Sequence, residues 1–326
     1  MLYKTVVGNY PRPDFLREEL LKIEGKQKKV DVSVKKVDDL HAKATAEVIK
    51  EFESCGIDIV TDGQLRWTDS LASFCESLSG MRMTGLIRFY DNNFYYRQPE
   101  VTGTVSWSKP SYAGDFAYAK KTAKKQVKCV LPGPYTLARL CKNSYYSGVE
   151  WLMHDLATAL AMEAKALADA GCTYLQIDEP SLVFDKKLEV GVPAIREALR
   201  KVESAFAGTT MLQTYFGGFT EPLSDILDVK FDAFGFDMVE GKSNLAFLKE
   251  HPLGRDIGIG IVNSRDILME KPKELKKTIS TVMKLSNPKK AYISPNWGLE
   301  LIPREYAVKK LKLLTAVVDE VKEDRA

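Results

Sequence analysis

Four acidic side chains directly follow short apolar runs, where carboxylates could line a pocket: Asp62, Asp178, Glu179 and Asp237. A carboxylate in a pocket can hold an ammonium group or transfer a proton. Each of these residues alone is equally consistent with capping a helix or accepting hydrogen bonds within a loop. The set as a whole favours a functional site more than any member does.

Other polar, glycine and aromatic residues follow the remaining apolar runs. They are Gly8, Asn9, Gln64, Arg66, Tyr215, Asn263 and Trp297. If the runs are parallel strands of one barrel, their carboxyl ends meet on one face, where barrel enzymes carry their chemistry. The sequence therefore predicts a single pocket lined by residues from several strand ends.

The apolar runs themselves have the length and composition of buried parallel strands, which are almost continuously apolar. Helical patterns separate most of them, as at 151–170, 272–285 and 303–321, and a helix near Asp38 is expected to end before Gly56. Eight such strand–helix units predict an α/β protein with one TIM (β/α)8 barrel over residues 1–326. The predicted strands are 5–8, 57–60, 127–131, 174–177, 210–214, 233–236, 257–261 and 291–293.

A long insertion separates the second and third predicted strands. Residues 67–125 exceed what one helix requires, and the stretch 89–97 (FYDNNFYYR) is aromatic and polar. One interpretation is a hairpin packed on the barrel rim. The other is a wall of the ligand site, because loops at one end of a barrel carry function. The two interpretations are compatible.

The positions of sulfur and imidazole donors argue against a metal site. Zinc in enzymes is bound by Cys, His and carboxylate side chains. The three histidines (His41, His154, His251) fall in predicted helices or at their ends. Cys55, Cys129 and Cys172 do not follow a predicted strand. We therefore expect no metal and no cofactor bound by this chain, and we expect the cysteines to be buried apolar residues.

Composition excludes several classes of protein. With 47 Lys+Arg against 44 Asp+Glu in 326 residues, the formal net charge of +3 is too small to indicate nucleic-acid binding. No stretch of about 18 apolar residues is present, so no membrane association is expected. The beginning of the sequence lacks the apolar core of a signal peptide, and no CxxC pair occurs. These features predict a cytoplasmic protein without disulfides.

Six segments resemble the cobalamin-independent methionine synthase family, and the resemblance extends over nearly the whole chain. Enzymes of this family carry two barrels in one chain, and the N-terminal barrel is the more similar one. The segments are 89–100 (FYDNNFYYRQPE), 130–136 (VLPGPYT), 176–182 (QIDEPSL), 214–217 (TYFG), 260–265 (GIVNSR) and 294–299 (SPNWGL). QIDEP occurs in both barrels, whereas DNNFYYRQPE and TYFGG indicate the N-terminal one.

The resemblance also implies roles for individual residues. The family's catalytic barrel binds zinc through a His-x-Cys pair, a Glu and a Cys, and the zinc activates homocysteine for attack on a methylfolate. At the matching positions this chain has Tyr215, Gly217, Asp237 and Trp297. The family's amino-acid site is matched by the backbone of Gly8 and Asn9, by Arg66 and by Asp178, which would hold the ammonium group. Gln64 replaces a Glu of that site.

These observations lead to three hypotheses for the function. The first is a split methionine synthase, in which this barrel covers a separate zinc-bearing catalytic chain, excludes water and helps to bind the tail of the folate substrate. The second is a stand-alone methyltransferase with another methyl donor, such as a methylated corrinoid. The third is a protein that binds a folate or an amino acid without chemistry.

Overall fold

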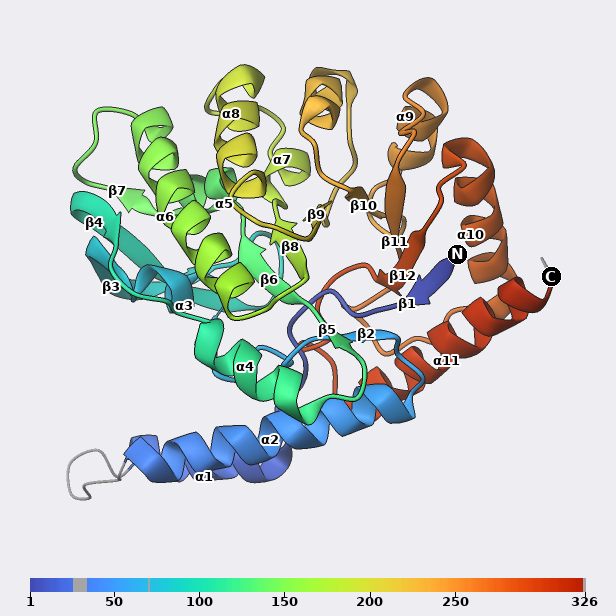
Figure 1. The fold of residues 1–326 in the computed structure, drawn as a ribbon, viewed down its shortest axis with the longest axis horizontal. Helices are drawn as coiled ribbons and strands as arrows, with labels where there is room; N and C mark the ends of the chain where they lie inside the picture. The colour runs from blue at the N-terminus through green and yellow to red at the C-terminus, as the bar shows by residue number, and fades with distance from the viewer. Residues whose placement is uncertain (26–33, 70, 325–326) are drawn as a thin grey trace.

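The computed structural model describes residues 1–25, 34–69 and 71–324 and shows parallel strands enclosed by helices (Figure 1). Seven strands form one parallel sheet in the order β1 (Leu2–Lys4), β12 (Ala291–Pro295), β11 (Asp256–Val262), β10 (Ala233–Asp237), β9 (Thr209–Gln213), β8 (Tyr174–Asp178) and β6 (Cys129–Pro132). Consecutive segments are neighbours around most of this sheet, as a succession of strand–helix units requires.

A shorter pair of strands completes the circle. β2 (Ile59–Val60) pairs in parallel with β5 (Gln126–Val127), and Ile59 also forms a bridge with Thr5, which follows β1. Lys128 lies directly before β6, and its amide donates to the Val60 carbonyl of β2 at 2.9 Å. This bond connects the short pair to the β6 edge of the seven-stranded sheet. The sheet therefore curls into a TIM-type barrel, and the predicted fold class is confirmed.

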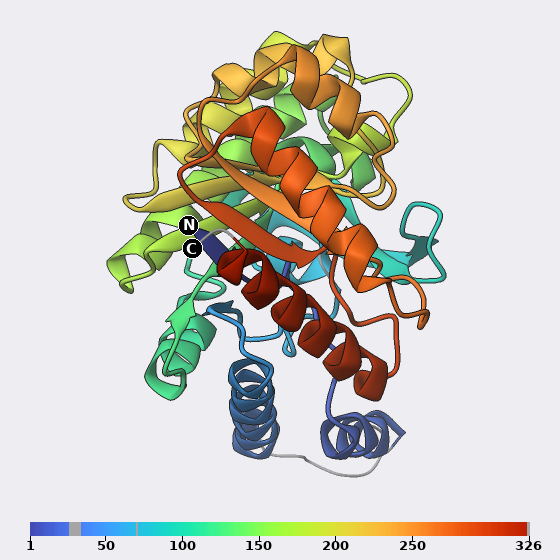
Figure 2. The same cartoon turned by 90° about the vertical axis from the view of Figure 1, so that its right-hand side faces the viewer.

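Helices cover the outside of the barrel. The long ones are α1 (Asp14–Gly25), α2 (Val34–Ser54), α4 (Ala113–Thr122), α6 (Val149–Asp169), α8 (Val192–Glu203), α10 (Pro272–Ser286) and α11 (Arg304–Glu323). Shorter elements are α3 (Ala72–Cys75), α5 (Pro134–Leu140), α7 (Ser181–Phe184), α9 (Asn244–Glu250) and the 3₁₀ helix η1 (Glu221–Asp228). In Figure 2, α10 and α11 pack across the outer face of β11, β12 and β1. Within the described residues, no helix is long and apolar enough to span a membrane.

Three predicted boundaries are wrong. The first strand is Leu2–Lys4 and not 5–8, because Val6 and Val7 are buried in the barrel mouth without strand pairing. The predicted strand 127–131 is divided into β5 and β6, which pair with different neighbours. The helix expected to begin near Asp38 begins at Val34, so Asp38 lies inside α2. Gly56, with φ +83°, ends that helix region as predicted.

The insertion contains a long antiparallel hairpin of β3 (Leu78–Arg88) and β4 (Tyr95–Trp107). The short strand β7 (Lys142–Asn143) adds to β4. Two irregularities in the β3–β4 register bend the hairpin. Its turn, residues 89–94, reaches the mouth of the barrel, as the contacts described below show.

Glu163 of α6 holds the end of this insertion on the barrel. Its carboxylate is fully buried and accepts hydrogen bonds from Trp107 Nε1 at 2.8 Å and from the backbone amides of Ser111 and Tyr112, both at 2.9 Å. A buried carboxylate is stable only when such donors surround it. The same bonds fix the segment that connects β4 to α4.

Glu163→Ala should lower the free energy of unfolding by about 3 kcal/mol, because it leaves buried donors without an acceptor and opens a cavity. Urea unfolding measures the change. Glu150→Gln, at an exposed position of the same helix, is the matched control and should change the value by less than about 0.5 kcal/mol. Equal effects of the two variants would contradict the anchoring role of Glu163.

Candidate functional site

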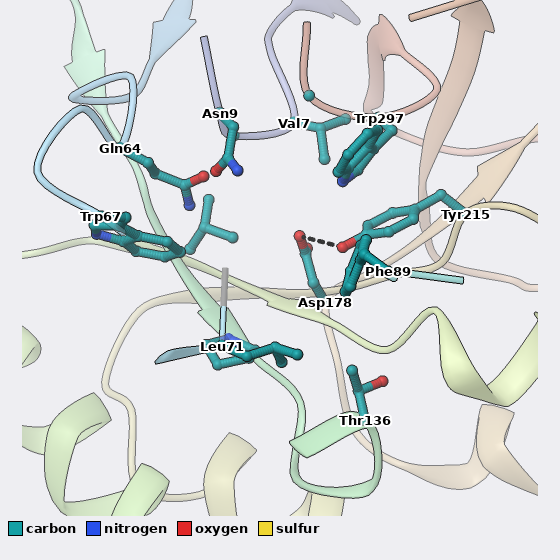
Figure 3. Close-up of a pocket in the computed structure, with 14 residues that line it drawn as sticks. Val7, Asn9, Gln64, Trp67, Leu71, Phe89, Thr136, Asp178, Tyr215 and Trp297 are labelled. Atoms are coloured by element: carbon teal, nitrogen blue, oxygen red, sulfur yellow. Dashed lines mark hydrogen bonds between the residues drawn. The ribbon is translucent and has the colours of Figure 1, made fainter. Parts of the chain in front are cut away.

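A small cavity of about 20 Å³ lies at the carboxyl end of the barrel strands (Figure 3). Residues within or after β6, the last residue of β8 and residues that follow β1, β2, β9 and β12 line it, together with the hairpin turn. Its walls are Val7, Gly8, Asn9, Gln64, Trp67, Leu71, Phe89, Val130, Pro132, Thr136, Asp178, Tyr215, Trp297 and Gly298. This is the face of a barrel on which active sites are built.

Asp178 is at the centre of the polar part of the cavity. Side chains alternate along a strand, so Tyr174, Gln176 and Asp178 of β8 share one side. Gln176 donates from Nε2 to Asp178 Oδ1 at 2.7 Å, and Tyr215 donates its hydroxyl to Asp178 Oδ2 at 3.3 Å. Figure 3 shows the Tyr215 and Asp178 side chains pointing toward each other. Both carboxylate oxygens are therefore held by neutral donors.

A buried lysine continues this network below the cavity. Lys128 Nζ donates to Gln176 Oε1 at 2.6 Å, so Gln176 connects the lysine to Asp178. Burial raises the pKa of Asp178 to about 7, and Lys128 and the two donors oppose the rise. Burial also lowers the pKa of Lys128 to about 7, against the attraction of Asp178. Both groups therefore change charge near neutral pH.

Six of the predicted site residues meet in the cavity: Gly8, Asn9, Gln64, Asp178, Tyr215 and Trp297. Asn9 donates from Nδ2 to Glu300 Oε1 at 2.7 Å. Gln64 packs so closely on Gly8 that a Cβ at residue 8 would lie 2.7 Å from Gln64 Oε1. A side chain at position 8 would therefore displace Gln64 from the cavity wall.

The other predicted residues do not line the cavity. Arg66 pairs with Asp38 on the outside of the barrel at 2.7 Å. Asn263 donates to Asp266 at 2.6 Å within its own loop. Asp62 accepts the Gln64 amide at 3.0 Å and lines a neighbouring small cavity with Lys128.

Glu179 and Asp237 accept hydrogen bonds from backbone amides. Glu179 accepts the amides of Tyr135 and Thr136, both at 2.8 Å, and so binds the beginning of α5. Asp237 accepts the amides of Phe216 and Val239 at 2.9 and 2.8 Å. These two carboxylates satisfy buried donors near the mouth and have no direct access to the cavity.

The sequence reasoning missed several lining residues. Trp67 and Leu71 come from the first part of the insertion, and Thr136 comes from α5. The aromatic stretch 89–97 was the one signal for Phe89, which lines the cavity. The hairpin is therefore both a rim element and a wall of the site, in agreement with both interpretations of the insertion.

The hairpin turn is held over the mouth by contacts with three parts of the barrel. Phe89 stacks on Trp297 with ring centroids 6.0 Å apart. The hydroxyls of Tyr90 and Ser181 are 2.6 Å apart. Asp91 forms an ion pair with Arg265 at 3.0 Å, and that arginine lies 5.4 Å from the centre of the Phe216 ring. These contacts limit the access of water to the cavity from this side.

Left-handed backbone is concentrated around the cavity. Gln64 has φ 53°, Tyr90 φ 53° and Phe216 φ 70°, and the fourth such non-glycine residue in the described chain, Asn287, ends α10. A side chain in this conformation costs of order 1 kcal/mol and persists where surrounding contacts impose it. Hydrogen bonds of Asp62 with the Gln64 amide and of Asp237 with the Phe216 amide provide those contacts.

The residues that the resemblance matches to zinc ligands have side chains that do not fit a zinc ion. Tyr215 and Trp297 present aromatic rings, and Gly217 packs against the Val183 carbonyl with no room for a Cβ. Asp237 is the one possible ligand, and its oxygens accept amide hydrogens. None of the described residues that line the cavity is a Cys or a His. Among the described residues, one cluster could hold a metal, Glu221, Glu250 and His251, on the outer surface at η1 and α9.

A wider groove adjoins the cavity and shares Asn9, Gln64 and Trp67 with it. It has a volume of about 310 Å³, and Arg12, Arg17 and Arg304 are among its lining residues. Glu300 also lines the groove, and burial raises its pKa to about 7. The groove gives the cavity a route to solvent, and its charged lining residues are the three arginines and the acidic Asp69 and Glu300.

The unfolding free energy of Asp178→Asn, relative to that of the unchanged protein, should increase as the pH rises. The raised pKa of Asp178 means that the folded state binds the proton more tightly than the unfolded state, so stability is lost as the pH rises through about 7. The difference in unfolding free energy should grow by about 2 kcal/mol between about pH 5 and 8. Urea unfolding at both pH values measures it, and exposed Asp228→Asn should show no such growth.

At position 64, glycine should give a more stable protein than alanine by about 1 kcal/mol, because φ 53° strains any residue with a Cβ. Both Gln64→Gly and Gln64→Ala remove the amide group of the side chain. The difference between their unfolding free energies therefore reports the strain that the Cβ causes. At Glu197, exposed in α8, the order should reverse, because alanine is favoured in helices. Thermal and urea unfolding test both pairs, and an alanine preference at position 64 would rule out the strain.

Comparisons with known proteins place the chain in a family. Residues 2–320 match the family model described as "Cobalamin-independent synthase, Catalytic domain". The chain is 29% identical to the methionine synthase of Saccharolobus solfataricus over 99% of this chain and 96% of that protein. It is 30% identical to that of Sulfurisphaera tokodaii over 95% of this chain and 90% of that protein. The family model that matches is described as the catalytic domain and not as the N-terminal barrel. The greater similarity of this chain to the N-terminal barrel therefore stays a prediction.

Two solved structures share the fold. A B12-independent methionine synthase from Shewanella sp. W3-18-1, in complex with selenomethionine, has a TM-score of 0.84 at 19% identity and covers 99% of this chain and 98% of its own. A putative B12-independent methionine synthase from Listeria monocytogenes has a TM-score of 0.79 at 18% identity, with 97% and 96% covered. With a family model matched along almost its whole length, the chain belongs to the cobalamin-independent methionine synthase family.

Proposed function

We propose that this chain takes part in methyl transfer to homocysteine and leaves activation of the thiol to a separate zinc-bearing chain. The observation that carries the proposal is the replacement of the zinc ligands by Tyr215, Gly217 and Trp297, which cannot bind zinc in their place. In this proposal the chain is the N-terminal-type barrel of a split methionine synthase. It works in methionine biosynthesis but is not catalytic alone.

Methyl transfer between a thiolate and a methyl donor requires alignment and exclusion of water more than it requires an acid or base. The hairpin over the mouth of this barrel would supply both requirements on one side of the reaction. The Asp91–Arg265 ion pair and the Phe89–Trp297 stack hold the hairpin in place. In the complex, these contacts would present a fixed surface to the substrate of the partner chain.

Exposed apolar side chains on the rim support docking of a partner. Leu86 and Tyr95 of the hairpin are 60% and 55% exposed, and Leu268, in the loop after β11, is 73% exposed. The Asp91–Arg265 ion pair brings the hairpin end and this loop together. Exposed apolar residues gathered at one rim are typical of an interface. The partner we propose is the zinc-bearing catalytic barrel.

The adjoining groove is the proposed place for the folate tail. Folate tails carry carboxylates, and Arg12, Arg17 and Arg304 are among the residues that line the groove. Guanidinium groups bind carboxylates through paired hydrogen bonds. The groove opens directly beside Asn9 and Gln64, so a bound tail would point the methylated end of the folate toward the cavity mouth.

Reconstitution with the zinc-bearing barrel from the organism that makes this chain tests the proposal. Methionine formation from methylfolate and homocysteine should require both chains. Leu268→Glu should lower the rate at limiting partner by about tenfold, because it buries a charge in the interface. The matched control is Met162→Glu, which changes an exposed apolar residue on the outer face of α6 and should leave the rate unchanged. If the zinc-bearing chain forms methionine equally well without this protein, the proposal fails.

A stand-alone methyltransferase is the second candidate. It is favoured by the extent of the matches, since the Saccharolobus solfataricus protein named methionine synthase is covered over 96% of its length by this single barrel. The methyl donor would then be another compound, such as a methylated corrinoid. Methionine formation by the isolated chain with such a donor, or stoichiometric zinc in the purified protein, would favour this candidate over the split enzyme.

A further inference from the structure

We propose that Glu221, Glu250 and His251, on the outer surface of the barrel, form a binding site for one divalent transition-metal ion of the zinc type. These three side chains, the outer cluster, come from the beginning of η1 and the end of α9, and their ligand atoms lie within 4.8 Å of one another. The outer cluster shares no residue with the cavity or the groove at the barrel mouth. The inference therefore goes beyond the proposed function and does not depend on it.

Buried contacts hold the two segments that carry the outer cluster against each other. Phe219, just before η1, donates its amide to Asn244 Oδ1 at 2.8 Å. Its carbonyl accepts from Ser243 Oγ at 2.9 Å. The rings of Phe219 and Phe247 are 5.2 Å apart, and both side chains are buried. The beginning of η1 is therefore fixed against α9 without any ion, which reduces the ordering that binding would cost.

His251 is the most constrained of the three ligands. Its side chain is 25% exposed, and its ring centre lies 4.6 Å from that of Phe247. His251 Nε2 lies 2.8 Å from Glu221 Oε2, although the two residues are 30 positions apart in the sequence. With metal–ligand distances of about 2.0–2.1 Å, neighbouring ligand atoms around one zinc ion lie about 3 Å apart. The Glu221–His251 pair therefore needs little movement to bind an ion.

The negative charge of the outer cluster is not neutralised by nearby basic side chains. Among the described residues, no lysine or arginine forms an ion pair with Glu221 or Glu250, and His251 is the partner of Glu221. Glu250 is exposed at the end of α9, so rotation of its side chain can bring a carboxylate oxygen onto the ion. Two carboxylates and a neutral imidazole then offer a divalent cation a charge that matches its own.

The donor set determines which cation fits. One imidazole nitrogen and two carboxylate oxygens suit Zn²⁺, Co²⁺ and Ni²⁺, with water completing the coordination. Mg²⁺ and Ca²⁺ take oxygen ligands instead. A cluster of carboxylates alone would not discriminate in this way. The imidazole of His251 therefore predicts that zinc binds much more tightly than magnesium.

Titration calorimetry of the whole chain with ZnCl₂ and with MgCl₂ tests the inference. The protein is first stripped of metal with a chelator, which is then removed, and the titrations are made at about pH 7.5, where an ordinary imidazole is uncharged. One zinc ion per chain should bind with a dissociation constant in the micromolar range, and magnesium should bind at least about 100-fold more weakly. Zinc binding weaker than micromolar, or equal binding of the two ions, would overturn the inference.

Variants of the ligands locate the bound ion. His251→Phe keeps a ring beside Phe247 and removes the nitrogen, so it should weaken zinc binding by at least about tenfold. Glu221→Gln and Glu250→Gln should each have a similar effect and keep the size of the side chain. The matched control is His154→Phe, because His154 is an exposed histidine that lies 3.2 Å from one carboxylate, that of Asp155. Unchanged zinc binding by His251→Phe, or an equal loss in the control, would contradict the site.

Cobalt(II) in place of zinc distinguishes this site from one that uses thiols. Cobalt bound by nitrogen and oxygen has weak visible absorption bands, whereas sulfur ligands add intense charge-transfer bands. Weak bands that His251→Phe abolishes are the expected result, and intense sulfur bands would overturn the inference. Because the outer cluster lies apart from the barrel mouth, loss of zinc in His251→Phe also separates this ion from one bound in a catalytic site. The result is therefore independent of whether the split-enzyme proposal holds.

Discussion

The cost of burying the Asp178 carboxylate determines the arrangement of the barrel mouth. A carboxylate removed from water must be paired, given hydrogen bonds or protonated. Gln176 and Tyr215 donate to its two oxygens, and Lys128 contributes a positive charge from behind Gln176. None of these neighbours fully compensates the charge, which is why the pKa of Asp178 rises to about 7. The cavity retains electrostatic attraction for a ligand because this compensation is incomplete.

The aromatic lid follows from the same constraint. Water that reached Asp178 freely would solvate the carboxylate and cancel its attraction for a ligand. The hairpin prevents this by placing Phe89 on Trp297 and by joining Asp91 to Arg265. Holding this geometry requires strained backbone at Gln64, Tyr90 and Phe216. Strain of this kind is found where function needs a conformation that the chain alone would not adopt.

The fold could be predicted because its signal is local. Runs such as 174–177 and 233–236 are apolar over the length of one strand and are separated by helical patterns, so β8 and β10 were found close to their true bounds. The short barrel strands were harder. β2 and β5 have two residues each, and burial of Val6 and Val7 without strand pairing resembles a strand in sequence.

The site was predicted only in part, because position after a strand does not decide what a side chain binds. Asp178 and Glu179 are neighbours in sequence and have opposite directions in space, since side chains alternate along an extended chain. Asp178 faces the cavity, whereas Glu179 accepts the amides of α5. Trp67 and Leu71 could not be found at all, because their place depends on how the insertion folds back over the barrel. That path is set by long-range contacts such as the bonds to Glu163.

The exchange of metal ligands for aromatic rings changes the kind of ligand that this barrel position can recognise. Thiolate and imidazole donors hold a soft divalent cation, which in turn binds and deprotonates a thiol. Tyr215 and Trp297 offer ring faces instead, and Asp178 keeps a negative charge beside them. The described lining residues therefore include none of the sulfur or imidazole donors that hold zinc. The fold can therefore remain that of its family while the chemistry at the strand ends differs.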